Sequence, residues 1–390
     1  MTDLYQQAQA WFKYSQAIRR DLHRHPEMGF QEVRTAGIVA KELRELGLEV
    51  TTGVAKTGVI AMIDGASPGP TVLVRVDMDA LPIQEETGKE YASTQAGVMH
   101  ACGHDGHVAV GLTVARLLLG YRSVLRGQVK LVFQPAEEGL DGAEGMIAAG
   151  VLENPKPAHT LGLHIWNEKP VGWVGVVPGP LMAGGEMFTI RLTGKGGHGA
   201  LPHLAVDPIN AAAQVITGLQ SIISRNVSPL ESAVISVTMV HSGDAFNIIP
   251  QKAELRGTIR TFEPLVRELV LARFREVVSQ IAGAMGCTSE IDLVRLTPPV
   301  INDPQVAERI AAQVRMVLPQ ADLDTDFRTM VSEDMAFMME KVPGCYLMVG
   351  GANPALGLDF PHHHPKFDFD ETALVWASAT LSAAVLEMLK

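Results

Sequence analysis

The hydrophobic pattern changes along this chain, and that change most constrains the fold. Short runs of consecutive apolar residues, with helix-like segments between them, occupy residues 71–76, 128–133, 160–163 and 345–349. Consecutive apolar residues are typical of strands buried on both faces, as in a parallel sheet covered by helices. Apolar residues at helical spacing before residue 47 and over 108–119 predict such helices. We therefore predict an α/β fold with a mostly parallel sheet and helices on both faces.

The middle of the chain has a different pattern. Within residues 186–193, apolar side chains occupy every second position. This alternation is typical of strands with one face in water, as in an antiparallel sheet. Alternating strands are predicted at 186–193, 233–240 and 253–259, with helices at 208–224 and 264–285. The middle segment is therefore expected to form an α+β sandwich of one sheet and two helices.

The two patterns predict two domains, as the length of 390 residues also favours. The larger domain comprises residues 1–182 and 297–390. The smaller one, residues 183–296, is inserted into it, and the stretch LTPPVINDP returns the chain to the first domain.

Composition excludes several classes of partner. The net charge of −11 argues against nucleic acid and acidic membranes. The three cysteines are scattered without a CxxC, so a disulfide framework is not expected and a reducing compartment is. The N-terminal stretch lacks the pattern of a signal peptide, and no apolar run approaches the ~20 residues needed to cross a bilayer. We expect a cytoplasmic protein.

Potential metal ligands follow the predicted strands. In open α/β sheets, ligands bind beyond the carboxyl ends of the strands, so these side chains are expected to lie close together. Cysteine, histidine and carboxylate are the ligands of zinc-type ions, and two such ions can polarise an amide carbonyl. The candidates after strands are Asp77, Asp79, Glu137, Glu138 and His164. Further candidates are Cys102 and His104 in a loop, and the histidines at 362–364 late in the chain.

Each candidate has an ordinary explanation when it is taken alone. The loop MHACGHDGHVAV (99–110) could cap a helix, the pair Glu137-Glu138 could be a solvated turn, and Asp77 could cap the next helix. Their joint occurrence after strands favours metal binding. Because neighbouring side chains point in different directions, one of the two glutamates can bind metal while the other acts as general base. GKGGHG (194–199) matches a dinucleotide-binding pattern, but an alternating strand precedes it and no acidic strand end follows.

Several motifs, in order along nearly the whole chain, resemble one enzyme family. This is the hippurate hydrolase and indoleacetyl-amino acid hydrolase group of dinuclear metallopeptidases, which includes aminoacylases and carboxypeptidase G. The motifs are DLHRHPEMGFQE (21–32), RVDMDALPIQEETG (75–88), HACGHDGHVA (100–109), QPAEEG (134–139), LGLHIW (161–166), GKGGHGALPH (194–203), FNIIP (246–250), GTIRTF (257–262), SEDMAFM (332–338) and PHHHPKFDFDE (361–371).

The resemblance implies a set of site residues. Glu137 matches the general base, and Asp79 matches the acid that orients a metal ligand. The family has a histidine two residues before a proline, which selects His363 from the late run and leaves His362 and His364 off the metal. The implied metal ligands are Cys102, His104, Glu138, His164 and His363.

The resemblance also implies a homodimer with two divalent ions per subunit. The inserted domain matches the family's dimerisation domain, from which His198 reaches across the dimer to stabilise the oxyanion. Asn247 and Arg260 resemble residues that bind the substrate's carbonyl and carboxylate; the ordinary alternatives are a turn before Pro250 and an exposed strand position. Zinc suits a cysteine ligand, and manganese, cobalt or nickel are the alternatives in the group.

The expected function is metal-dependent hydrolysis of the amide bond of N-acyl or N-aroyl amino acids. Within the enzyme class, the alternatives are a carboxypeptidase or dipeptidase, and a deacetylase of acetylated diaminopimelate or cysteine. Outside it, the alternative is a metal-binding dimer without catalysis. The presence of both Glu137 and His198 argues against that last alternative, because a binding protein needs neither.

Overall fold

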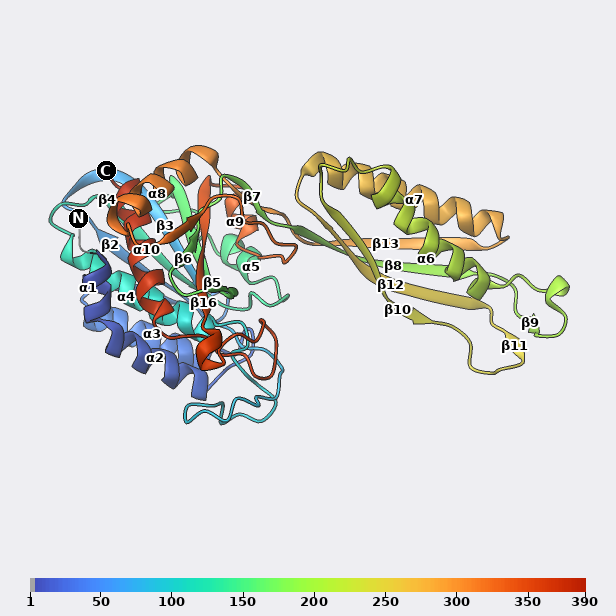
Figure 1. The fold of residues 1–390 in the computed structure, drawn as a ribbon, viewed down its shortest axis with the longest axis horizontal. Coiled ribbons are helices and arrows are strands. Elements are labelled where there is room, and N and C mark those ends of the chain that lie inside the picture. Colours follow the sequence, from blue (N-terminus) through green and yellow to red (C-terminus); the bar gives the residue numbers. More distant parts are fainter. Residues whose placement is uncertain (1–3) are drawn as a thin grey trace. The chain divides into compact units, whose positions relative to one another are not determined.

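A computed structural model describes residues 4–390, which form two compact units (Figure 1). The first unit contains the chain up to Leu181, Ile301–Phe327 and Asp334–Lys390; the second contains Met182–Val300 and Arg328–Glu333. The two points where the chain passes from one unit to the other, after Leu181 and after Val300, lie within a few residues of the predicted domain boundaries. The segment 328–333 falls in the second unit because Ala183 N–H donates to the carbonyls of Thr329 and Val331. That the second unit is a dimerisation domain stays a prediction.

The first unit is built on an eight-stranded sheet. Its four central strands, β4, β3, β5 and β16, run parallel, and antiparallel pairings join β1, β2 and β6 to them. The predicted mostly parallel sheet is therefore confirmed for the centre. In order across the sheet, the strands are β1 (Glu49–Val54), β2 (Gly58–Asp64), β4 (Arg126–Gln134), β3 (Ser67–Asp77), β5 (His159–Pro170), β16 (Gly344–Ala352), β6 (Trp173–Gly175) and β15 (Asp322–Asp324).

Helices cover both faces of this sheet, as predicted. One face carries α4 and α10, which are apolar on nearly all sides and are buried between the sheet and outer helices. The other face carries a smaller cluster around α5 and α9. The helices are α1 (Leu4–Ala10), α2 (Phe12–Arg24), α3 (Val33–Glu45), α4 (His104–Gly120), α5 (Gly142–Ala148), α8 (Pro304–Val317), α9 (Ala336–Met339) and α10 (Ala373–Met388), with a 3₁₀ turn, η2 (Pro354–Leu356).

One predicted strand end is wrong. The strand expected to stop before His164 continues to Pro170, because β16 pairs with it along its whole length. On its other side, β3 pairs only as far as Gly162. His164 therefore lies inside β5, but beyond the point where β3 leaves it. The antiparallel pair β1–β2 was not predicted at all.

The second unit is a four-stranded antiparallel sheet with two helices on one face. Phe188, Ile190 and Leu192 of β8 lie in its core, which confirms the alternation seen in the sequence. The elements are β10 (Ala233–His241), β12 (Lys252–Thr261), β8 (Gly184–Thr193) and β13 (Thr288–Thr297), in sheet order, with α6 (Pro208–Arg225) and α7 (Pro264–Ala284).

Short elements complete the fold. A two-stranded pair, β9–β11, lies at one end of the second unit, beyond the ends of β8 and β12 (Figure 1). The chain leaves and re-enters the first unit through β7 and β14. Their bounds are β7 (Gly179–Met182), β9 (Gly197–His198), η1 (Pro202–Leu204), β11 (Ile248–Ile249) and β14 (Val300–Asn302). Among residues 4–390, no helix is long and apolar enough to cross a membrane.

The core of the second unit depends on the contact between Phe274 of α7 and Phe188, whose ring centroids are 4.8 Å apart. Phe274 is fully buried. Phe274→Ala should lower the free energy of unfolding of this unit by about 3–5 kcal/mol, because it removes buried area and leaves a cavity. Urea denaturation measures the change. Val294→Ala, at a largely exposed position on β13, should stay within about 0.5 kcal/mol of the parent; equal losses in both variants would contradict this packing.

Candidate metal centre

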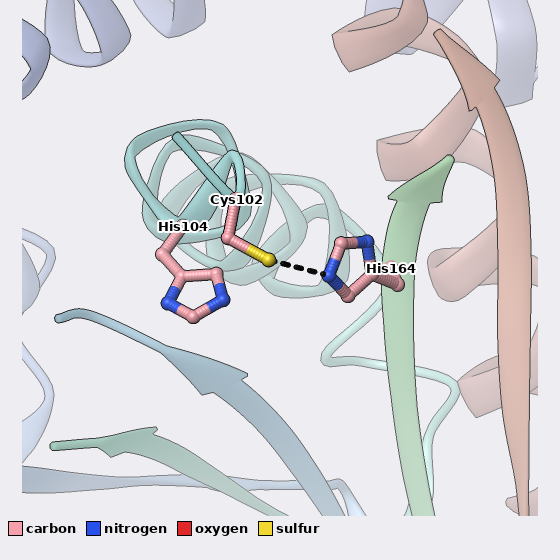
Figure 2. A group of neighbouring side chains, drawn as sticks. All are labelled: Cys102, His104 and His164. Carbon is pink, nitrogen blue, oxygen red and sulfur yellow. Dashed lines mark hydrogen bonds between the residues drawn. The ribbon is translucent and has the colours of Figure 1, made fainter. Parts of the chain in front are cut away.

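The ligands predicted in the first unit converge at the carboxyl ends of its central parallel strands. Asp79 follows β3, Glu138 follows β4 and His164 lies in β5. Figure 2 shows the Cys102 thiol pointing between the imidazoles of His104 and His164. The predicted meeting of these side chains at one edge of the sheet follows from the parallel arrangement of the strands.

Cys102 and His104 are placed by the start of α4. Gly103 between them has φ +91°, a conformation that side chains disfavour, and the helix begins at His104. Cys102 Sγ lies 3.4 Å from His164 Nε2. His164 Nδ1 donates to its neighbour's carbonyl, Ile165 O, at 2.7 Å, so Nε2 keeps its lone pair toward the thiol.

Asp79 orients two of the predicted ligands. Its Oδ1 accepts from His104 Nδ1 at 3.1 Å, and its Oδ2 accepts from the backbone N–H of Glu138 at 3.0 Å. The hydrogen bond to Nδ1 leaves His104 Nε2 buried without a hydrogen-bond partner in the described chain. A metal-binding histidine is held in this way, with one nitrogen donating to a carboxylate and the other free to bind.

The late histidine run contributes one imidazole to the group. His363 Nε2 lies 3.1 Å from Glu138 Oε1, and the residue has φ +64°, with its backbone N–H donating to Ala101 O. His362 Nε2 instead accepts from the backbone N–H of Asn167, and His364 stacks on a phenylalanine ring outside the cluster. The structure therefore separates His363 from its two neighbours; that His363 is the metal ligand of the three stays a prediction.

The ligand atoms form overlapping groups. Within each group, every ligand atom lies within 4.8 Å of the others; the groups are Cys102–His104–His164, Cys102–Glu138–His363 and His104–Glu137–Glu138. Because Cys102, His104 and Glu138 each belong to two groups, the arrangement suits two neighbouring ions rather than one. Asp77, His104 and His107 form a further group, but both nitrogens of His107 are engaged, with Asp77 Oδ1 and with Ile165 N–H.

Negative charge accumulates at this site. Burial and the carboxylates of Glu138 and Glu137 hold the pKa of the Cys102 thiol well above its usual value. Burial alone would lower the pKa of His104, but Asp77 and Asp79 raise it to about 10. Burial and neighbouring imidazoles lower the pKa of His164. A thiol, imidazole nitrogens and several carboxylates are the donor set of a divalent metal site.

Glu137 lies beside the group on a tightly held turn. The residue before it, Ala136, has φ +55°, and Glu137 Oε1 accepts from the backbone N–H of Asp334 at 3.3 Å. Its side chain reaches the ligand atoms of His104 and Glu138. A carboxylate in this position can take a proton from a water molecule next to the metal ligands.

A buried ion network, which sequence reasoning did not assign, supports the ligand loop. The fully buried Arg19 of α2 donates to Asp105 at 2.8 Å and to Asp368 at 2.7 Å. Asp105 also accepts from His23 Nδ1. Arg19 thereby joins the start of α4 to the segment that follows the late histidines. The only signal for it was that DLHRHPEMGFQE, just after Arg19, begins the family motifs.

The remaining predicted residues lie in the second unit, in two places. His198 is paired with Ile248 in the β9–β11 pair, and Gly199 N–H donates to Asn247 O, so His198 and Asn247 are neighbours. Arg260 lies on β12 opposite Gly185, near the start of β8. Arg260 is half-buried rather than fully exposed, and burial lowers its pKa. Within one chain, the structure does not bring Arg260 and His198 together.

This chain resembles known proteins along most of its length. The model of the family described as Peptidase family M20/M25/M40 matches residues 73–387. The chain is 42% identical over 380 residues to N-acetylcysteine deacetylase of Bacillus subtilis, covering 96% of this chain and 97% of that protein. It is 39% identical over 361 residues to thermostable carboxypeptidase 1 of Saccharolobus solfataricus, covering 92% and 91%. The solved YXEP protein of Bacillus subtilis, described as a dinuclear metal-binding peptidase of the M20 family, matches with a TM-score of 0.85 and 38% identity, covering 97% and 99%.

The buried network of Arg19, Asp105 and His23 predicts a pH dependence of the free energy of unfolding. Burial alone would lower the pKa of His23, but Asp105 and Glu85 raise it to about 8. Since the unfolded value is about 6.5, protonated His23 stabilises the fold fully below about pH 6.5, and this contribution is lost as the pH rises through 8. His23→Gln should remove on the order of 2 kcal/mol of this pH-dependent stability, measured by urea denaturation from about pH 6 to about pH 9.

The exposed His203 provides the control. His203→Gln should leave the pH dependence unchanged. A slope as steep in His23→Gln as in the parent would show that another group causes it.

Proposed function

This chain belongs to peptidase family M20/M25/M40 and is a metal-dependent hydrolase of amide bonds, and we propose that its substrates are N-acyl amino acids. The observation that carries this proposal is the convergence of the predicted ligands beside Glu137, at one edge of the parallel sheet. We assign the metal to Cys102, His104, Glu138, His164 and His363. When bound, two divalent ions, zinc or else manganese, cobalt or nickel, supply Lewis acidity that polarises the amide carbonyl and lowers the pKa of water.

Glu137 acts as the general base and acid. Its carboxylate takes a proton from the attacking water and later delivers it to the leaving amine. Asp79 keeps His104 and Glu138 in place through the hydrogen bonds described above. The turn at Ala136 aims Glu137 toward the ligand atoms while its neighbour Glu138 turns toward His363.

We propose a homodimer in which His198 of the partner subunit stabilises the oxyanion, together with the partner subunit's Asn247. Support comes from distances within the second unit. Arg260 is opposite Gly185, whereas His198 follows Thr193 at the other end of β8, about 25 Å away at ~3.3 Å per residue. An N-acyl amino acid cannot span that distance, so one substrate cannot touch both residues of the same chain.

Arg260 is the candidate for the substrate's free carboxylate. Its guanidinium is half-buried and donates only to its neighbour's carbonyl, Ile259 O, at 3.3 Å, with no acidic partner among the described residues. Such a group gains a charge-assisted, two-pronged contact when a carboxylate binds. The second-unit residues would then divide between carboxylate binding and, in the partner, carbonyl stabilisation.

The alternatives within the family are a carboxypeptidase or dipeptidase, and a deacetylase of acetylated diaminopimelate or cysteine. Relatives at similar identity include both a deacetylase and a carboxypeptidase. A panel of hippurate, N-acetyl amino acids and dipeptides separates these classes, and preference for dipeptides would overturn the acyl-amino acid proposal. We also propose a cytoplasmic location, since a reduced Cys102 thiol is needed as a ligand.

Glu137→Gln should retain metal and lose turnover. The amide cannot accept the proton of the attacking water, so kcat should fall by about 10²–10⁴-fold. Elemental analysis measures the metal content, and a hippurate assay measures the rate. Glu144→Gln, an exposed position on α5, serves as the control and should keep the parental rate. Near-normal activity in Glu137→Gln would reject the base assignment.

Mixing two inactive variants tests the shared site. Glu137→Gln and His198→Ala should each be inactive alone. After subunit exchange, a mixed dimer has one site with Glu137 from one chain and His198 from the other, so random mixing should restore about a quarter of the parental rate. No recovery, with exchange shown by native mass spectrometry, would mean that His198 serves its own chain or none.

A further inference from the structure

The turn that carries Glu137 has an unusual backbone. Ala136, immediately before it, has φ +55°, in the left-handed region that residues with a β-carbon rarely adopt. Such a conformation persists only where the surroundings hold it, and it occurs often where a functional side chain must be aimed. The groups that hold Ala136 therefore control the direction of Glu137.

The side chain of Glu32 is hydrogen-bonded to the backbone of this turn. It is fully buried, and its Oε1 accepts from the backbone N–H of Ala136 at 2.9 Å. Its Oε2 accepts from the hydroxyl of Thr57 at 2.6 Å, and Thr57 lies in the turn that joins β1 to β2. Although Glu32 precedes α3, its side chain makes no capping hydrogen bond to that helix.

The backbone around Glu32 is also fitted to the turn. A β-carbon on Gly29 would lie 3.1 Å from the β-carbon of Ala136, so this glycine lets the two segments approach closely. On the other side of Glu137, Asp79 accepts from Glu138 N–H. The base is therefore held between two carboxylates, Glu32 on the amide before it and Asp79 on the amide after it.

We propose that Glu32 is a positioning residue that aims the Glu137 carboxylate. This inference rests on the proposed role of Glu137 as general base. In the part of the chain that the structure describes, the Glu32 side chain makes no hydrogen bond to a predicted metal ligand. Its effect should therefore fall on proton transfer rather than on metal binding. The motif DLHRHPEMGFQE, which contains Glu32 and Gly29, thereby gains a role at the site.

Two substitutions at Glu32 test this role. Glu32→Leu fills the space but cannot accept from Ala136 N–H, so kcat on hippurate should fall about tenfold to a hundredfold, with KM and metal content close to parental values. Glu32→Gln keeps one carbonyl oxygen for Ala136 and can donate to the Thr57 oxygen, so it should restore most of the rate. If Glu32→Leu does not fold, Thr57→Val loosens the same carboxylate and should lower kcat to a smaller extent.

Glu27 offers a matched control in the same motif. Its carboxylate accepts from the backbone N–H groups of Arg34 and Thr35 at the start of α3, and within residues 4–390 it makes no hydrogen bond to the turn at Ala136. Glu27→Leu should lower the melting temperature without the selective loss of kcat. If Glu27→Leu and Glu32→Leu lose kcat equally, Glu32 has a general structural role and the proposal fails.

The decisive measurement is a double-mutant cycle with Glu137→Gln. If Glu32 acts through Glu137, adding Glu32→Leu to Glu137→Gln should change the residual rate by less than about twofold. Three results would each overturn the inference: a tenfold or greater fall in the residual rate of the double variant, loss of metal in Glu32→Leu, or parental kcat in Glu32→Leu. An active Glu137→Gln single variant would instead reject the proposed role of Glu137 as general base, so the two failures are distinguishable.

Discussion

The crowding of negative charge at one edge of a parallel sheet is the constraint on which the rest of the first unit depends. Asp77, Asp79, Glu137 and Glu138 meet there beside a buried thiol and three imidazoles. Carboxylates held so close repel one another unless positive charge lies among them. Two buried arginines, Arg75 and Arg19, lie nearby, and Arg75 neutralises one of these carboxylates, Asp77. Arg75 pairs with Asp77 and Asp334, and Arg19 pairs with Asp105 and Asp368. The charge left at the centre is what a divalent ion can balance.

The surrounding architecture serves to hold that charge in place. Several predicted ligands on the first unit are held by regular elements or by buried carboxylates. His104 lies in α4 and His164 in β5, Asp79 binds Glu138 N–H, and Glu32 binds Ala136 N–H. Hydrogen bonds to charged acceptors are stronger than those between neutral groups, so these contacts can maintain left-handed residues such as Ala136. Burial of the large apolar core around α4 and α10 offsets the free energy that this ordering costs.

Much of the fold was predictable because its signals are local. The apolar runs that became β3, β4 and β16, and the alternation that became β8, β10 and β12, depend only on which faces of a strand are buried. The meeting of Asp79, Glu138 and His164 was predictable for a related reason, since residues at the carboxyl ends of parallel strands share one edge of the sheet. The antiparallel pair β1–β2 was missed because its exposed edge strand lacks a strong apolar pattern. The length of β5 was missed because it is set by pairing with β16, about 180 residues away in sequence.

The sequence by itself determined the two kinds of sheet and the types of the candidate ligands, and it predicted that one of Glu137 and Glu138 binds metal while the other acts as base. These follow from residue chemistry and periodicity, which need no knowledge of distant contacts. Only the tertiary structure decided that both nitrogens of His107 are engaged, and that Arg260 and His198 of one chain lie near opposite ends of β8. It also placed Glu32 against the turn that carries Glu137, and Arg19 against Asp105 at the start of α4. The physical reason is that side-chain direction and long-range hydrogen bonds are fixed only when segments far apart in sequence pack together.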